Sequence, residues 1–418
     1  MTITITGTAI FILIIIAADT LLHAAADVLN IQSFKKKIPD GFTEFYDPDE
    51  YQKARKYLQA TTQFGQLSSL FDLAILLGFW FLGGFEILDQ TVRGFGLNPV
   101  FTGVIYIATL LVFKSILDLP FSVYSTFVIE EKFGFNQTTV KTFVFDMAKG
   151  AALFAVLGVP LIAGIFAFFE YAGPQAWLYC WAALVAFMLF IQYIFPSWIM
   201  PLFNTFEPLE DGPLKEAAFA HAKAVQFPLQ NIFVMDGSKR SSKSNAFFTG
   251  FFKKKRIVLY DTLIKNHGAD EIVGILAHEI GHYQKKHIVK NLLINVAQTG
   301  VMFFLLSLCL SRQWLFDAFF VEQMSVYAGM IFFAMLYSPV EFFIQIFVMI
   351  LSRKNEYEAD EFAAATTGNG KALALALKKL SVSNLSNLTP HPFYVFLNYS
   401  HPPVLDRVKR METFEGGA

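Results

Sequence analysis

Cysteine and charge are both scarce in this sequence. Only two of the 418 residues are cysteine, Cys180 and Cys309, and both lie inside apolar runs. This argues against a disulfide framework and against a cysteine nucleophile. Charged residues make up 16% of the chain, whereas typical soluble domains have roughly 25%. The formal net charge of -1 gives no indication of a nucleic-acid partner. The composition therefore excludes an ordinary soluble enzyme.

Apolar residues are abundant, at 55% of the chain, and phenylalanine alone accounts for 48 residues. Runs of roughly 20 apolar residues are long enough to cross a bilayer as a helix. Seven such runs lie near residues 3–25, 66–88, 99–128, 149–170, 175–199, 291–311 and 325–350. No basic segment precedes the first run, so we do not expect it to be a cleaved signal peptide. The sequence predicts an all-α, multi-pass membrane protein with seven transmembrane helices.

Lysine and arginine are concentrated in alternate connections between these runs. They occur after the first run, after the third run and throughout 201–290, at Lys35, Lys36, Lys37, Lys53, Arg55, Lys56, Lys132, Lys141 and many later positions. The other connections hold only Arg93, Arg312 and no basic residue at 171–174. Because basic loops favour the cytoplasmic side, we expect the N-terminus outside and both 201–290 and the C-terminus inside.

Several apolar runs carry groups that are costly in lipid. Asp19, His23 and Asp27 follow one another at four-residue spacing, as do Lys114 and Asp118. Such groups normally face the interior of a helix bundle. The first three could form a second metal site, but a wet interior cavity satisfies them equally well, and we favour the cavity. Further acidic residues in or near the runs are Asp72, Glu170 and Glu341.

The most informative stretch is EIVGILAHEIGHYQKKH, at 271–287. His278 and His282 are four residues apart and therefore lie on one face of a helix, where both imidazoles can bind one zinc ion. Glu279 lies between them and is placed to act on a water at the metal. Apolar residues precede the motif at helical spacing, which favours a half-buried helix over a chance pair of surface histidines.

A catalytic zinc usually has three protein ligands and one open position. One family of sites takes a third histidine from the same segment, after a glycine turn. Here Lys285 and Ile288 occupy those two places, and His287 is one residue away from the required position. The third ligand is therefore expected from elsewhere in the chain.

The run SRKNEYEADEFA, at 352–363, offers a glutamate on a later helix. Glu356 and Asp360 are one turn apart and share a helix face. We predict Glu356 as the third ligand and Asp360 as the acceptor of a hydrogen bond from the unligated nitrogen of a zinc histidine. Glu358 and Glu361 fall elsewhere on this helix and are expected to be solvated.

These motifs, with others in the same order, resemble the Ste24 family of integral-membrane zinc metalloproteases, the type I CAAX prenyl proteases of peptidase family M48. The matching segments are EEKFGFNQTT, PLFNTFEPLEDGPLK, FVMDGSKRSSKSNAFFTGF, KRIVLYDTLI, LAHEIGHYQKKH, SRKNEYEADEFA and SHPPVLDRV. One departure is Lys243, where the family is expected to carry histidine.

The resemblance implies seven long helices that enclose a large water-filled chamber. A small α+β region of the gluzincin type would hold the zinc at the cytoplasmic end of this chamber. We expect transmembrane helices at 1–200 and 291–351, the metalloprotease segment at 201–290, and a C-terminal segment with the third ligand at 352–418.

Within 201–290, the runs NIFVM, NAFFTGFF and RIVLY are typical of short strands separated by turns. A small sheet beside the zinc helix would offer an edge to which an extended peptide can add as a strand. The resemblance implies that Asn245 and Ala246 hold the substrate there, although a hairpin that only packs on the helix remains the alternative. The basic cluster Lys253 to Arg256 is expected to be a solvated turn near anionic lipid.

The predicted mechanism uses one zinc ion per chain, which lowers the pKa of a bound water and polarises the scissile carbonyl. Glu279 would take the proton of that water and return it to the leaving amine. The resemblance implies that His401 and Arg407 lie beside the zinc and stabilise the oxyanion. From the sequence alone, His401 before two prolines could equally be a loop histidine.

By the same resemblance, the substrate would be the C-terminus of a farnesylated CaaX protein, cleaved after the prenyl-cysteine with release of a tripeptide. No residue in the sequence indicates prenyl specificity by itself. Two alternatives stay open: a quality-control protease for membrane proteins without prenyl specificity, and a non-enzymatic membrane chamber or transporter. The protein would lie in the inner membrane of a bacterium or in the endoplasmic reticulum of a eukaryote.

Overall fold

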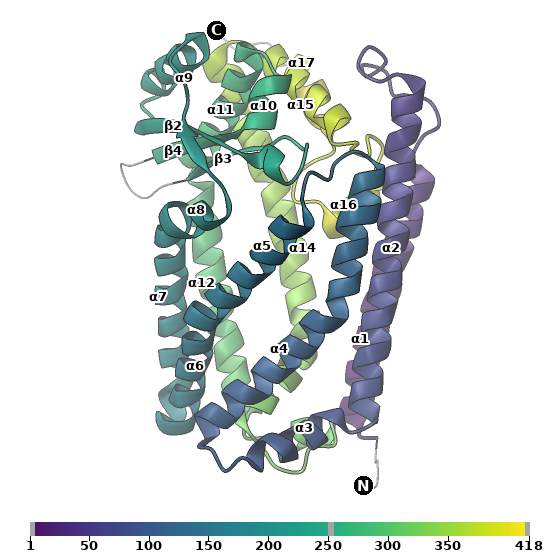
Figure 1. Ribbon diagram of the computed structural model, residues 1–418, viewed down its shortest axis with the longest axis vertical. Coiled ribbons are helices and arrows are strands. Elements are labelled where there is room, and N and C mark those ends of the chain that lie inside the picture. The colour runs from purple at the N-terminus through teal and green to yellow at the C-terminus, as the bar shows by residue number, and fades with distance from the viewer. Residues whose placement is uncertain (1–4, 250–254, 414–418) are drawn as a thin grey trace.

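The long apolar runs form long helices in the computed structural model, which describes residues 5–249 and 255–413 (Figure 1). Within these residues, seven helical segments are long and apolar enough to cross a membrane, which confirms the predicted number of spans. They are α1 (Gly7–Ser33), α2 (Pro48–Phe81), α4 with η1 (Pro99–Tyr124, Ser125–Glu130), α5 with η2 and α6 (Val140–Leu153, Phe154–Gly158, Val159–Tyr171), η3 with α7, η4 and α8 (Gly173–Gln175, Ala176–Ile194, Phe195–Ile199, Met200–Phe203), α12 (His287–Cys309) and α14 (Val326–Thr367).

The second span differs from the predicted range of 66–88. Helix α2 begins at Pro48 and ends at Phe81, and a separate short helix, α3 (Gly84–Arg93), lies across the end of the bundle (Figure 1). Gly83 separates α2 from α3 and has a φ of 74°, a backbone conformation that glycine adopts without strain. Apolar residues continue across this break, so hydropathy alone did not locate it. The first predicted run starts at residue 3, and residues 3 and 4 lie outside the described part of the chain.

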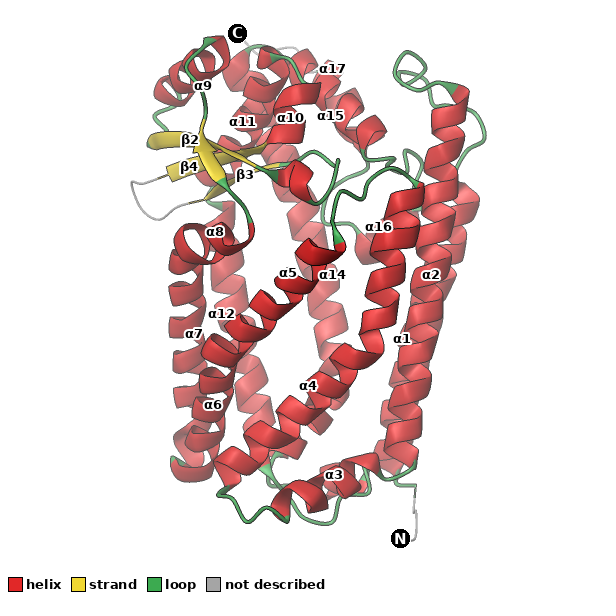
Figure 2. Cartoon of the chain, in the orientation of Figure 1, coloured by secondary structure: helices red, strands yellow, loops and turns green. Residues whose placement is uncertain are grey.

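A small sheet lies at the end of the bundle that also holds the C-terminal helices (Figure 2). Its strands follow the order β1-β2-β4-β3, with β2 parallel to β4 and the other two pairs antiparallel. Within the described residues, no strand pairs with the outer side of β3, so β3 is an edge strand. The strands are β1 (Phe206–Pro208), β2 (Leu229–Met235), β3 (Ala246–Thr249) and β4 (Lys255–Tyr260).

Short helices surround this sheet and the opposite end of the bundle. At the end that carries the sheet are α9 (Pro213–Ala224), η5 (Gly237–Lys239), α10 (Asp261–Asn266), α11 (Ala269–Gln284), α15 (Gly370–Ser383) and α17 (Val404–Glu412), whereas α16 (Pro392–Asn398) packs against α1 and α14 and α13 (Gln313–Asp317) belongs to the far end. Of the predicted basic turn, Lys253 and Lys254 lie outside the described residues, whereas Lys255 and Arg256 begin strand β4 rather than a turn.

Apolar packing holds the membrane helices together at their two ends. At the α3 end, the rings of Trp80 and Phe319 stack with centroids 4.4 Å apart, and those of Phe319 and Phe332 at 4.1 Å. At the opposite end, a second cluster includes Phe42 and Tyr51. Between these ends the helices bury little, since at most 17% of the most apolar stretch of any span is buried. The most apolar parts of the spans are therefore largely exposed, and the packed clusters lie towards the two ends.

Polar residues of the membrane helices contact one another. The Lys114 ammonium lies 3.0 Å from an Asp72 carboxylate oxygen and 2.5 Å from one of Asp118, which links α2 to α4. On α1, His23 Nε2 lies 3.5 Å from Asp19 Oδ1. Pairing of this kind reduces the cost of charges at membrane depth.

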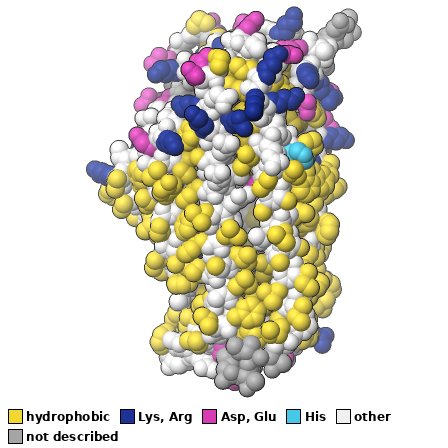
Figure 3. All heavy atoms as spheres, turned by 90° about the vertical axis from the view of Figure 1, so that its right-hand side faces the viewer, with side chains coloured by type: hydrophobic (Ala, Val, Ile, Leu, Met, Phe, Trp, Pro, Cys, Tyr) yellow, Lys and Arg dark blue, Asp and Glu magenta, His cyan; other side chains and the backbone are white. Residues whose placement is uncertain are grey.

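Apolar and basic side chains occupy different parts of the outer surface. On the face drawn in Figure 3, apolar side chains cover the shaft of the molecule, and lysine and arginine gather near the end that carries the sheet. This asymmetry matches the distribution of basic residues along the sequence.

Helix α11 packs closely on α14, and Gly281 makes this possible. A Cβ atom at this position would lie 3.1 Å from both the Cα and the carbonyl oxygen of Ala359 on α14. Any side chain there would push the two helices apart. Because α11 carries two histidines and α14 carries an acidic face, this close approach brings the predicted zinc ligands together.

Candidate metal centre

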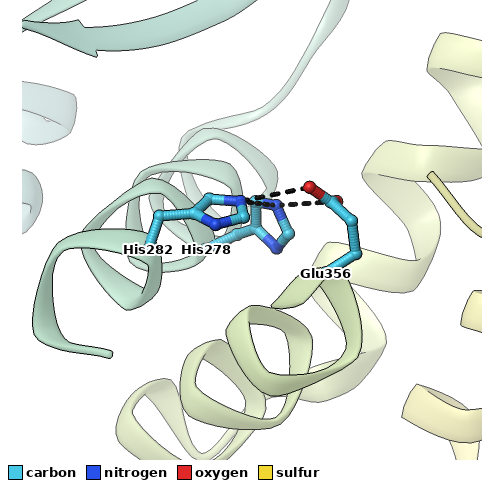
Figure 4. A group of neighbouring side chains, drawn as sticks. All are labelled: His278, His282 and Glu356. Atoms are coloured by element: carbon cyan, nitrogen blue, oxygen red, sulfur yellow. Dashed lines mark hydrogen bonds and ion pairs between the residues drawn. The ribbon is translucent and has the colours of Figure 1, made fainter. Parts of the chain in front are cut away.

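The two histidines of the HEIGH motif come from one buried helix, and the glutamate comes from another. Helix α11 buries its apolar face against the sheet and carries His278 and His282 one turn apart. Helix α14 reaches the same place from the membrane and contributes Glu356. Figure 4 shows the three side chains pointing toward one another from the two helices.

The spacing of the three side chains fits a tetrahedral metal. The Nε2 atoms of His278 and His282 are 3.2 Å apart. Glu356 Oε2 lies 3.4 Å from His278 Nε2, and Glu356 Oε1 lies 3.3 Å from His282 Nε2. Zinc–ligand distances of about 2.0–2.1 Å in a tetrahedron correspond to ligand separations of about 3.3–3.4 Å. Glu356 Oε2 is buried and forms no hydrogen bond of good geometry with the described residues, and its contacts with His278 Nε2 and Arg407 Nη1 are both 3.4 Å long.

Asp360 contacts His278 from α14. It is 1% exposed, and its Oδ1 lies 2.9 Å from His278 Nδ1. A proton on Nδ1 that is donated to this carboxylate leaves the lone pair of Nε2 directed at the metal position. Burial alone would lower the pKa of His278, but its contacts with the carboxylates of Asp360 and Glu356 raise this pKa to about 9. Binding of a metal by this histidine would then release a proton.

His282 is held by a pair of residues that the sequence analysis did not assign. Its Nδ1 lies 2.9 Å from His287 Nδ1, and His287 Nε2 lies 3.1 Å from Glu358 Oε2. Glu358 was expected to be solvated, but it contacts this buried histidine. The contact depends on Lys286, whose φ of 58° ends α11 and turns the chain into α12. The spacing of residues in the sequence gives no indication of this contact between His287 and Glu358.

Glu279 lies between the two histidines on α11 and is partly buried. Burial raises the pKa of its carboxyl group, while the nearby His278 and His282 lower it and Glu356 raises it. A carboxylate whose pKa is raised toward neutrality is suited to accept a proton and to return it.

His401 and Arg407, from the C-terminal segment, both reach Glu356. His401 Nε2 lies 3.4 Å from Glu356 Oε1, and its side chain is 62% exposed. Arg407 is buried, with Nη1 3.4 Å from Glu356 Oε2 and with two bonds of 2.8 and 2.7 Å donated to Asp360. A cavity of about 340 Å³ opens beside His401 and Arg407. The structure thus brings together every residue predicted to surround the metal.

The predicted substrate residues lie at the start of edge strand β3. The Asn245 carbonyl accepts a hydrogen bond of 3.1 Å from the backbone of Tyr260, and Ala246 is the first residue of β3. Phe248, further along β3, packs edge-on against Tyr283 of α11 at a centroid distance of 6.4 Å. The edge strand therefore runs beside the helix that carries the two histidines.

Lys243, the departure from the family pattern, has well-defined contacts. Its Nζ lies 2.8 Å from the Tyr57 hydroxyl and 3.0 Å from Glu130 Oε2, and it stands 4.4 Å from the centroid of the Phe135 ring. These contacts join the segment before β3 to α2 and η1. The partners come from distant parts of the chain.

Across residues 5–249 and 255–413, His278, His282 and Glu356 are the only histidine, cysteine or acidic residues grouped closely enough to hold a metal ion. Asp19, His23 and Asp27 do not form such a group. The interpretation of these three as a second metal site is therefore not supported.

Comparisons with known proteins agree with this geometry. The family described as "CAAX prenyl protease N-terminal, five membrane helices" matches residues 27–205, and "Peptidase family M48" matches residues 208–415. A CAAX prenyl protease 1 homolog from Oryza sativa subsp. japonica is 40% identical over 316 residues, which cover 75% of this chain and 74% of the relative. CAAX prenyl protease 1 from Saccharomyces cerevisiae is 34% identical over 403 residues, which cover 90% of this chain and 88% of the relative.

A solved structure is similar over almost the whole chain. The crystal structure of S. mikatae Ste24p superposes with a TM-score of 0.92 at 33% sequence identity, and the match covers 98% of this chain and 100% of that one. Together the two family matches cover 27–205 and 208–415, and the second contains the metal centre. The chain therefore belongs to the Ste24 family, the CAAX prenyl protease 1 group of M48 metalloendopeptidases.

Proposed function

We propose that this membrane metalloendopeptidase holds one zinc ion per chain with His278, His282 and Glu356. The observation that carries the proposal is the set of separations of 3.2–3.4 Å between the three ligand atoms, which suits tetrahedral zinc. Two imidazole nitrogens and one carboxylate oxygen are also ligands typical of catalytic zinc in proteases. Zinc bound there would polarise the scissile carbonyl and lower the pKa of the attacking water.

Glu279 is the proposed general base. Its raised pKa and its position between the two histidines support proton transfer from the attacking water and then to the leaving amine. Asp360 would hold His278 and Arg407 in place through the hydrogen bonds already described.

His401 and Arg407 are proposed to stabilise the negative charge that develops on the carbonyl oxygen. The Arg407 guanidinium is buried, and its pairing with Asp360 opposes the effect of burial and raises its pKa, so the positive charge is retained. Although the His401 side chain is 62% exposed, partial removal of water from its ring lowers its pKa, which favours the neutral imidazole near neutral pH. A neutral imidazole can still donate a hydrogen bond to an oxyanion.

The peptide is proposed to bind as an extra strand on β3. The outer edge of β3 is unpaired among the described residues, and Asn245 and Ala246 begin this edge next to α11. Main-chain hydrogen bonds to an edge strand hold a peptide extended, which exposes its carbonyl groups to the metal.

The proposed substrate is the C-terminus of a farnesylated CaaX protein, cut after the prenyl-cysteine to release a tripeptide. The names of the relatives support this class of substrate. A cavity of about 720 Å³ between α7, β3 and α12 also supports it, because its lining is mainly apolar and includes Phe187, Phe248 and Ile288. Burial of an isoprenoid chain there would contribute about 0.8 kcal/mol per CH₂ group.

The catalytic end is proposed to face the cytoplasm. The gathering of lysine and arginine at the end that carries the sheet supports this orientation, as does the alternation of basic loops along the chain. A CaaX C-terminus presented on the cytoplasmic side would then meet the metal centre directly.

Zinc content and turnover, measured together, distinguish ligand from base. Glu279→Gln keeps the side-chain shape but removes the proton acceptor, so we expect nearly normal zinc content and at least a ~100-fold loss of turnover. Glu356→Ala should lose zinc itself. Asp360→Ala should be intermediate, with about a 10- to 100-fold loss in zinc affinity or activity. Glu361→Ala, on the same helix, is the control. Full zinc content in Glu356→Ala would show that the third ligand is a different residue.

Substrate class is tested with a bulky residue in the apolar cavity. Val289 lines this cavity and is 52% exposed, whereas Leu293, one turn later on α12, is 62% exposed and does not line it. Val289→Trp should raise the KM for a farnesylated CaaX peptide by at least about fivefold, the equivalent of about 1 kcal/mol of overpacking. The KM for an unprenylated peptide should not change, and Leu293→Trp should affect neither. Equal turnover of both peptides by the wild type would favour the quality-control function.

Membrane orientation is tested by labelling. A tag inserted at Arg93, after α3, should be accessible only from outside the cell or organelle, and a tag at the C-terminus only from the cytoplasm. Intact and permeabilised membranes provide the comparison. If one side labelled both tags, the proposed path of the chain across the membrane would be incorrect.

A further inference from the structure

We propose that Glu358 and His287 form a relay that fixes the tautomer and orientation of His282, and that this relay sets zinc affinity. The inference rests on the proposed zinc site and extends it to two residues that do not themselves contact the metal position. It gives His282 a carboxylate-linked support of its own, separate from the one that Asp360 gives His278.

The order of donors and acceptors follows from the contacts. The ionised carboxylate of Glu358 can only accept, so His287 Nε2 carries the proton that bridges their 3.1 Å separation. The other nitrogen of a neutral His287 is then an acceptor. His282 must therefore donate its Nδ1 proton across the 2.9 Å contact with His287 Nδ1. This leaves the lone pair of His282 Nε2 for the metal.

The relay is built into the joint between three helices. His287 is the first residue of α12 and is 2% exposed, which excludes water as a competing partner for its ring nitrogens. Glu358 on α14 lies 3.9 Å from Lys354 Nζ and 4.0 Å from Lys290 Nζ, so nearby ammonium groups favour its ionised form. Helices α11, α12 and α14 thus each contribute one member.

A simple packing role for His287 predicts something different. If the ring only filled space against His282, at a centroid distance of 5.2 Å, then the identity of the group at Glu358 would not matter to zinc. In the relay, the carboxylate is essential because it determines which nitrogen carries the proton. An amide at 358 can present an N–H to His287 Nε2, which reverses the relay and puts the proton of His282 on the nitrogen that binds zinc.

The experiment measures the zinc dissociation constant of full-length protein by competition with a chelator of known affinity. Glu358→Ala and His287→Ala should each weaken zinc binding by about 10- to 100-fold. Glu358→Gln, which keeps the side-chain shape, should also weaken it. His287→Asn keeps an acceptor oxygen near the Nδ1 position and should recover part of the loss. Glu361→Gln is the matched control, because Glu361 pairs with Arg410 at the surface.

Non-additivity separates a relay from two independent effects on stability. Because both residues act through His282, the double variant His287→Ala/Glu358→Ala should bind zinc no more weakly than His287→Ala alone. Wild-type zinc affinity in folded Glu358→Gln and Glu358→Ala, or losses that add in the double variant, would overturn the relay. Absence of zinc from the wild type would instead overturn the proposed metal site, so the two failures are distinguishable.

Discussion

The close packing of α11 on α14 is the contact on which the metal centre depends. The two histidines and the glutamate lie on separate helices and are more than 70 residues apart in the sequence, and Gly281 allows the backbones of the two helices to approach. At 1.5 Å per residue, the 42 residues of α14 span about 63 Å, roughly twice the thickness of the hydrocarbon layer. This one helix is therefore long enough to cross the hydrocarbon layer and to carry Glu356 beyond it.

The membrane spans and the metal centre differ in how tightly their side chains pack. The most apolar stretches of the spans bury few residues, so the apolar clusters at the two ends hold the bundle together. The centre requires fixed side chains, and there the carboxylates are dense. Asp360 connects His278 to Arg407, while Glu358 connects to His282 through His287. Each of the two histidines therefore has its own link to a carboxylate.

Local periodicity predicted much of this molecule, and non-local contacts set the limit. Helical spacing was enough to choose Glu356 and to pair it with Asp360, and length with hydropathy gave seven spans. The end of α2 was misplaced because the break at Gly83 lies within an apolar run. The contact between His287 and Glu358 was missed because it needs a left-handed residue at Lys286 and three helices in contact. The proximity of His401 and Arg407 to the ligands came only from family resemblance.

The central claim is that a zinc ion binds to two imidazoles and one carboxylate at the joint of α11 and α14. X-ray absorption at the zinc edge on the purified, full-length protein tests it most directly. The account predicts one zinc per chain, with nitrogen and oxygen neighbours at about 2.0–2.1 Å, two of them imidazoles. Sulfur neighbours at about 2.3 Å, or a spectrum unchanged in the Glu356→Ala variant at full zinc content, would contradict it.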